Sequence, residues 1–315
     1  FTTFLSHNLY FDYSFEISSL PLSFPKFFWH LASYDGVHYL KIASLGYYKF
    51  FQTAFFPLYP ILINLFGSFT GNQFLTSLIL SLFFTYLSVI GIYRLGGIKA
   101  VILLLSFPLS FFLLCSYTES LFLSLTIWSY LFYKQGKINK AVILGILATA
   151  TRFYGIFLFV LLLYESIKNN SLKNFQKQIL LIPLGLVAYS LFLYFKFTDP
   201  LAFFHSLGSW GKSSLTLPPQ TIYRYLKILT QVSPKLPVYY VALLELISSV
   251  YGLLIALYYF KNKKLSYAIY ISLGVLIPMM TGTLQSLPRY LISLFPIFLI
   301  PADTKSMYFI VPPSL

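Results

Sequence analysis

Long apolar runs alternate with short polar segments along most of the chain. A membrane helix needs about 20 mostly apolar residues, because hydrocarbon offers no hydrogen-bond partner to a free backbone group. On this criterion we predict nine membrane-spanning helices, at residues 74–93, 100–114, 117–133, 141–152, 154–167, 179–197, 238–260, 265–280 and 287–300. Several of these runs are short, so we expect some helices to be tilted, broken or partly buried. The apolar run 55–69 contains Pro57 and Pro60 and predicts an interfacial or re-entrant helix.

Composition supports this interpretation and excludes other classes of protein. Of the 315 residues, 58% are hydrophobic and 10% are charged, and the mean hydropathy is +0.76, which indicates an all-α polytopic membrane protein. The net charge of +14 is spread between the apolar runs rather than gathered in one block, so we expect no nucleic-acid partner. Cys115 is the only cysteine, which excludes an internal disulfide and a thiolate zinc cluster.

Lysine and arginine in short loops predict which side of the membrane each loop faces. Basic residues occupy the turns near positions 94–99, 134–140, 168–177, 261–264 and 305, and we assign these turns to the cytoplasm. The opposite side then holds a large first loop, 1–73, with interfacial helices. The remainder, 74–315, is a transmembrane domain that includes a second outer loop, 198–237. Residues 1–28 carry neither a signal sequence nor a full span, and the apolar run near the end stops at Pro312, so we expect further helices upstream and downstream.

The ionisable and polar residues that stand out share one predicted location. All of them fall at the outer ends of spans or in the outer loops: Asp35, His38, Glu119, Arg152, Asp199, Trp210 and Arg289. Ionisable groups near hydrocarbon are costly and usually line a cavity or a path. We therefore expect a shared cavity on the outer face.

Six segments together resemble the PIG-V family of mannosyltransferases, in order and spacing, from about residue 28 to residue 300. They are YDGVHYLKIASLGYY with FFPLYPILI, FPLSFFLLCSYTESLFL, ATATRFYG, TDPLAFF, SWGK and LPRYLISLFPIF. The resemblance implies a GT-C glycosyltransferase fold with a catalytic Asp in the first outer loop. It also implies a polyprenyl- or dolichyl-phosphate mannose donor, a glycolipid or glycan acceptor, and an inverting reaction that gives an α-mannoside. We expect neither a cofactor nor a metal. The short loops favour a prokaryotic relative in a plasma membrane over a eukaryotic one in the endoplasmic reticulum.

Asp35 and His38 are the predicted catalytic residues. A single carboxylate suffices as general base, because a lipid phosphate leaves as a stable anion and needs no protonation. The alternative for Asp35 is to cap a helix that begins near Val37. His38 shares a helical face with Asp35 and could orient it or contact the donor phosphate. Its alternative is an interfacial histidine bonded to a backbone carbonyl.

Arg289 and Arg152 are the predicted holders of the donor phosphate, since a guanidinium can bind two phosphate oxygens. Arg289 is the first choice, because it follows Pro288 at the outer start of a span. For Arg152 we favour the alternative of a side chain that snorkels to the interface. Glu119 fits an S-x-x-E capping box with Ser116, and can also line the cavity.

Other predicted substrate contacts are aromatic. Tyr117 and Tyr290 are expected beside the sugar, and Trp210 is either a stacking platform or a membrane-interface residue. A groove for the isoprenoid tail is expected at Phe55, Phe56, Pro57 and Tyr59. For Asp199, which precedes a proline, capping of a helix start is favoured.

A different class of function fits the same composition. A transporter or flippase for a polar lipid would place ionisable pairs near the bilayer midplane, preferably in two repeated halves. The sequence shows no repeat, and Glu245 is the one acid away from the ends of a predicted span, where it lies nearer the outer end of its helix. A non-catalytic partner subunit would not need Asp35, His38 and Arg289 together. We therefore favour the glycosyltransferase.

Overall fold

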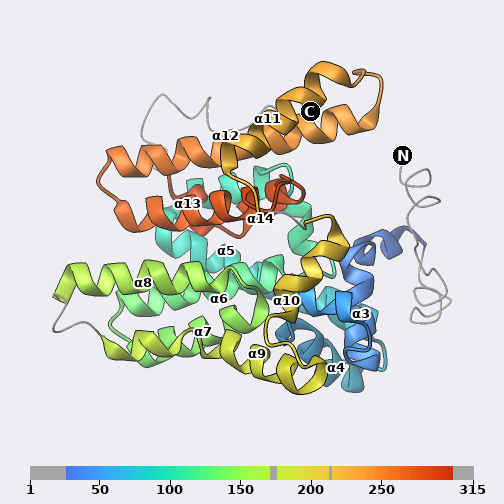
Figure 1. Cartoon of the computed structure of the whole chain (residues 1–315). Coiled ribbons are helices and arrows are strands. Elements are labelled where there is room, and N and C mark those ends of the chain that lie inside the picture. Colours follow the sequence, from blue (N-terminus) through green and yellow to red (C-terminus); the bar gives the residue numbers. More distant parts are fainter. Residues whose placement is uncertain (1–25, 171–175, 213–214, 301–315) are drawn as a thin grey trace.

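A computed structural model describes residues 26–170, 176–212 and 215–300, and in these residues all regular structure is helical (Figure 1). The described part begins with a 3₁₀ turn, η1 (Lys26–Ala32). Three elements of the predicted first loop follow: α3 (Asp35–Leu45), η2 (Phe50–Ala54) and α4 (Leu58–Thr70). The predicted interfacial helix at 55–69 is thus present as α4, which begins immediately after Pro57. The expected helices upstream and downstream of the chain lie outside the described residues.

Three helical segments in the described part are long and apolar enough to cross a membrane: α5 (Gln73–Ser106), η4 with α9 (Lys177–Leu181 and Leu184–Phe197), and α12 (Pro237–Lys261). α5 corresponds to two predicted spans, because its backbone breaks at Gly97 with φ 71° and ψ −167°. Only glycine adopts that conformation without strain. The break lies between Arg94 and Lys99, where we predicted a cytoplasmic turn.

The other predicted spans are shorter helices. They are α6 (Glu119–Lys134), α7 (Ile138–Thr151), α8 (Gly155–Asn170) and α13 (Leu265–Met279). α6 is buried on nearly its whole circumference, which is typical of a helix at the centre of a bundle. It packs between α5 and α7, while α13 joins α8 to α12 (Figure 1).

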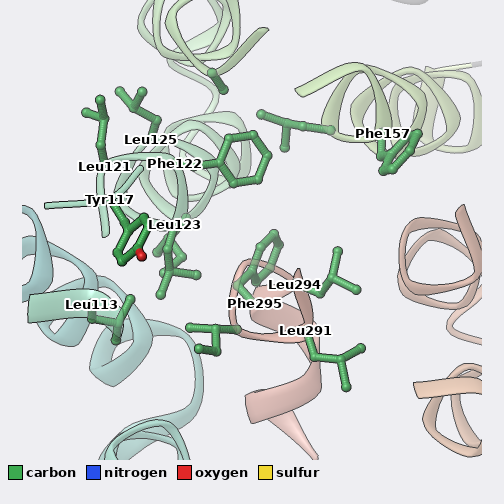
Figure 2. Packing of buried hydrophobic residues seen from close by; sticks show 14 of the residues in the cluster. Leu113, Tyr117, Leu121, Phe122, Leu123, Leu125, Phe157, Leu291, Leu294 and Phe295 are labelled. Atoms are coloured by element: carbon green, nitrogen blue, oxygen red, sulfur yellow. The ribbon is translucent and has the colours of Figure 1, made fainter. Parts of the chain in front are cut away.

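Two predicted spans are not continuous helices. The run 100–114 is helical only to Ser106, and η3 (Ser110–Leu114) follows after Pro108. The run 287–300 consists of α14 (Leu287–Ile292) and η6 (Phe295–Leu299), and Pro296 explains why the helix does not continue. Leu291, Leu294 and Phe295 lie in the interior (Figure 2), and all three are at most 1% exposed. Leu291 packs at Gly252 of α12, Leu294 packs at Gly274 of α13, and the Phe295 ring lies 5.3 Å from the ring of Tyr130 in α6. The second run is therefore part of the core.

The second outer loop is also helical. It contains α10 (Ala202–His205), η5 (Ser206–Trp210) and α11 (Pro218–Gln231). η5 packs on η2 of the first loop, and α11 packs along α12. The two predicted outer loops therefore meet at the end of the bundle where α3 lies (Figure 1).

Candidate functional site

Asp35 and Arg289, which are 254 positions apart in the numbering, form a direct ion pair. Nη2 of Arg289 lies 2.6 Å from Oδ2 of Asp35. Asp35 is the first residue of α3, and its side chain caps no backbone group, since the residue at the cap position is Tyr34 and no side-chain cap bond is present. The capping role considered for Asp35 is therefore wrong.

Glu119 joins the two predicted phosphate-binding arginines. Its Oε1 lies 3.0 Å from Nε of Arg289 and 3.1 Å from Nη2 of Arg152, and its side chain is 1% exposed. Both Glu119 oxygens and the Arg289 Nε are buried without a partner in hydrogen-bond geometry, so the attraction is that of close charges rather than of aligned hydrogen bonds. Asp35, Arg289, Glu119 and Arg152 form one continuous chain of ions, which we call the ionic chain.

The capping box expected for Glu119 is not formed. The cap residue of α6 is Thr118, which makes no side-chain cap bond, and Ser116 Oγ instead hydrogen-bonds Ser77 Oγ at 2.6 Å. Glu119 begins α6 and points its carboxylate at the arginines. The interpretation of Arg152 as a snorkelling residue is also wrong. Its side chain is 12% exposed, and it donates a hydrogen bond to Ser293 Oγ at 3.2 Å in addition to its pair with Glu119.

Local backbone structure explains how these side chains reach one place. Arg152 directly follows α7 in an extended conformation, with φ −155° and ψ 147°, which turns its side chain out of the helical path. Arg289 sits in the first turn of α14, after Pro288, which is a favoured residue at a helix start. The Arg289 guanidinium also lies 5.1 Å from the centre of the Tyr117 ring. Such a cation–π contact holds the guanidinium in place.

The surroundings of Asp35 keep its carboxyl ionised. Burial raises the pKa of Asp35, but the charge of Arg289 and the hydrogen bond from it lower this pKa by more, and the net pKa lies below its ordinary value. The side chain is nevertheless 27% exposed, more than any other member of the ionic chain. Asp35 is therefore the member of the ionic chain that is most accessible to solvent.

His38 lies one helical turn after Asp35 in an aromatic cluster. Its ring centre is 5.5 Å from Phe51, 5.0 Å from Phe55 and 5.2 Å from Trp210. Its Nδ1 is buried without a hydrogen-bond partner. The structure therefore does not show the alternative in which this nitrogen bonds a backbone carbonyl.

Burial lowers the pKa of His38 to about 4, although the charge of Asp35 acts in the opposite direction. Since this pKa lies below the unfolded value of about 6.5, the folded state binds fewer protons than the unfolded state between these values. Stability is then fully present above pH 6.5 and falls as the pH drops towards 4. We expect the thermal unfolding midpoint to decrease over this window by less in His38→Phe than in the wild type. Equal decreases in both proteins would contradict a neutral buried His38.

The remaining aromatic residues surround the ionic chain. Trp210 donates through Nε1 to the carbonyl of Phe51 at 3.2 Å, so it belongs to the aromatic cluster of His38. Tyr117 donates to the carbonyl of Ser33 at 2.6 Å, two residues before Asp35. The ring of Tyr290 lies 5.4 Å from the Arg152 guanidinium. Trp210, Tyr117 and Tyr290 therefore all lie beside the ionic chain or the His38 cluster, and their contact with a substrate stays a prediction.

The residues expected to line a lipid groove lie in the packed interior. Phe55 and Phe56 are 6% and 5% exposed, and Tyr59 is fully buried. The Tyr59 hydroxyl donates to the carbonyl of Ser77 at 3.1 Å. In this structure the three aromatic side chains are packing residues, and the lipid groove at these residues and Pro57 stays a prediction.

Asp199 stands apart from the ionic chain. Its Oδ1 accepts the backbone N–H of Leu201 at 2.9 Å in the turn before α10. The cap residue of α10 is Leu201, which has no side-chain cap bond, so the predicted capping of the helix start by Asp199 is not formed. Its Oδ2 lies 2.7 Å from Nδ1 of His205. The hydrogen bond from His205 lowers the pKa of Asp199, which is exposed to solvent. Of the seven residues expected to converge, Asp199 is the one that the structure does not bring to the site.

Two functional candidates were missed at the level of sequence. Ser293 hydrogen-bonds Arg152, and Lys212 donates from Nζ to the Tyr290 hydroxyl at 3.2 Å. Lys212 belongs to the SWGK segment, which was a usable signal, whereas Ser293 lies in a featureless apolar run. Within the described ranges, no group of three or more His, Cys, Asp or Glu residues is placed to hold a metal ion. No family model, curated protein or solved structure matches the chain.

Proposed function

We propose that the protein is an integral membrane glycosyltransferase of the GT-C class, with nine spans in this chain and a PIG-V-like reaction. It transfers mannose, with inversion, from a polyprenyl- or dolichyl-phosphate donor to a glycolipid or glycan acceptor on the outer face of the membrane. The observation that carries the proposal is the pair of Asp35 and Arg289 at 2.6 Å, continued through Glu119 to Arg152. A general base and cations for a phosphate are the two requirements of this chemistry, and they lie side by side.

In the proposed reaction the acceptor hydroxyl attacks the anomeric carbon while Asp35 takes its proton. The bond from the anomeric carbon to the phosphate oxygen breaks, and its electron pair leaves with the lipid phosphate. A phosphodiester with one negative charge thereby becomes a phosphomonoester, which carries close to two above its second pKa of about 6. The enzyme has to stabilise that additional charge as it develops.

The ionic chain is suited to this change of charge. Asp35 becomes neutral when it takes the proton, and Arg289 then loses the partner that it holds in the free protein. The positive charge of Arg289 becomes available at the moment when the phosphate gains a negative charge.

The proposal is tested with the purified protein in vesicles, supplied with radiolabelled polyprenyl-phosphate mannose and a mixture of membrane glycolipids. We expect label in a new glycolipid and release of the polyprenyl phosphate. Movement of an intact labelled lipid between leaflets, without cleavage, would contradict the proposal and favour a flippase.

The sidedness of the site is tested separately with single cysteines. Cys115 is buried, so the background reaction is low. Ser209 and Asn139 are both exposed, in the second outer loop and in the first turn of α7. We expect Ser209→Cys to react with an impermeant thiol reagent from outside intact cells, and Asn139→Cys to react only after the membrane is opened. The reverse pattern would overturn the predicted topology.

A further inference from the structure

We propose that Lys212, together with Tyr290, binds the phosphate of the lipid-linked substrate and holds the lipid phosphate that leaves. The identity of this ligand rests on the proposed function. The inference differs from the expectation based on sequence, in which the two arginines hold the phosphate. It follows from the pairing of the positive charges at the site, since both arginines contact carboxylates and Lys212 contacts a tyrosine hydroxyl.

Both arginines are already committed to carboxylates. Arg289 contacts Asp35 through Nη2 and Glu119 through Nε, and Arg152 contacts Glu119 through Nη2. The second terminal nitrogen of Arg152 donates to Ser293. A phosphate that arrived directly at either guanidinium would have to break an existing ion pair, and one freed carboxylate would then remain largely buried without a partner. Breaking such a pair is costly.

Lys212 is the cation of the site that no carboxylate neutralises at short range. Across the described residues, no Asp or Glu oxygen lies within ion-pair distance of its Nζ, and its hydrogen bond goes to the Tyr290 hydroxyl at 3.2 Å. Glu245 acts on Lys212 only at longer range, and its Oε2 accepts a hydrogen bond from Tyr225 at 2.6 Å. With Lys212, the ionic chain has three cations and two carboxylates, and the excess of one positive charge suits a phosphodiester with one negative charge.

Tyr290 connects Lys212 to the ionic chain. It follows Arg289 directly in α14, and its ring lies 5.8 Å from that guanidinium, 5.4 Å from Arg152 and 5.5 Å from Nζ of Lys212. The Lys212 ammonium has three donors, of which Tyr290 uses one. The Tyr290 hydroxyl accepts that bond and keeps its own proton to donate. An anion between Lys212 and the guanidinium groups would thus find two ammonium donors and one phenol donor without displacing Asp35 or Glu119.

The interaction should strengthen as the reaction proceeds. The donor phosphate carries one negative charge and the leaving phosphate approaches two, so an ammonium beside it stabilises the transition state more than the bound donor. Loss of Lys212 should therefore lower kcat as well as raise KM. If Lys212 only anchored the loop through Tyr290, its loss would not lower kcat, raise KM and weaken phosphate binding together.

The experiment measures binding of farnesyl phosphate to the full chain in detergent, followed by the fluorescence of Trp210 and the other tryptophans, with farnesol as the uncharged probe. We expect Lys212→Met to weaken farnesyl phosphate binding by about 10- to 100-fold, the range for a lost hydrogen bond to a charged group, and to leave farnesol binding unchanged. Lys212→Arg should restore most of the affinity. Lys227→Ala, on the exposed face of α11, is the matched control and should bind as the wild type.

Three outcomes separate this inference from the proposed function. Equal affinity of the wild type and Lys212→Met for farnesyl phosphate would overturn the inference, even if mannose transfer occurs. Weaker binding in Lys212→Met but not in Lys227→Ala would support it, even if no sugar is transferred. A similar loss of farnesol binding in Lys212→Met would show that the lysine shapes the loop rather than binding phosphate, and would also overturn it. Thermal unfolding midpoints of all variants establish that the proteins compared are folded.

Discussion

Asp35→Asn is expected to reduce sugar transfer by at least about 100-fold, the lower end of what a positioned general base contributes. The amide of Asn keeps the size of the carboxylate but accepts no proton from the acceptor hydroxyl at neutral pH. It also removes the negative charge that Arg289 contacts at 2.6 Å. The measurement is the rate of transfer from labelled polyprenyl-phosphate mannose, normalised to the amount of folded protein.

Asp199→Asn is the matched control for this variant. Asp199 is a carboxylate of the second outer loop that accepts a hydrogen bond in the turn before α10 and is not part of the ionic chain. We expect transfer close to that of the wild type in this control. Full activity in Asp35→Asn would eliminate Asp35 as the base. A loss of activity explained entirely by a lower unfolding midpoint would likewise leave the proposed role of Asp35 without support.

The apolar pattern predicted the helices well, because long apolar runs have few alternatives to helix. It could not separate a lipid-facing run from a buried one. The run 287–300 looks like a span, yet Leu291, Leu294 and Phe295 are buried among α6, α12 and α13. Pro296 was the local signal for the break. The division of α5 at Gly97 was predicted correctly, because Arg94 and Lys99 mark a polar turn.

At the site, the sequence indicated which residues meet but not how they are paired. Asp35 and Arg289 were expected in one cavity, and they form a direct ion pair. For Glu119 the local sequence predicted a capping box. Its partners in the structure are instead arginines of α14 and of the end of α7. Contacts of this kind depend on how distant helices pack, and local patterns do not contain that information. Lys212 was missed as a site residue for the same reason.

Glu119 is expected to matter most for stability. It is 1% exposed between two guanidinium groups, so Glu119→Gln leaves the buried Arg152 without a carboxylate partner and Arg289 with Asp35 alone. Removal of one partner from a buried ion pair typically costs about 3–5 kcal/mol, whereas replacing both partners with apolar groups is often neutral. We therefore expect a large fall in the thermal unfolding midpoint of the detergent-solubilised protein.

The pairing with Arg152 makes this expectation specific. Glu119→Gln combined with Arg152→Met leaves one arginine fewer to repel Arg289, so the double variant should be more stable than the sum of the two single effects predicts. Glu165→Gln is the control, since Glu165 bonds Ser266, between α8 and α13, and belongs to no ion pair in the described residues. It should lower the midpoint by less than Glu119→Gln. Strict additivity of the two single effects would mean that Glu119 and Arg152 are not coupled, and the ionic chain would then end at Glu119.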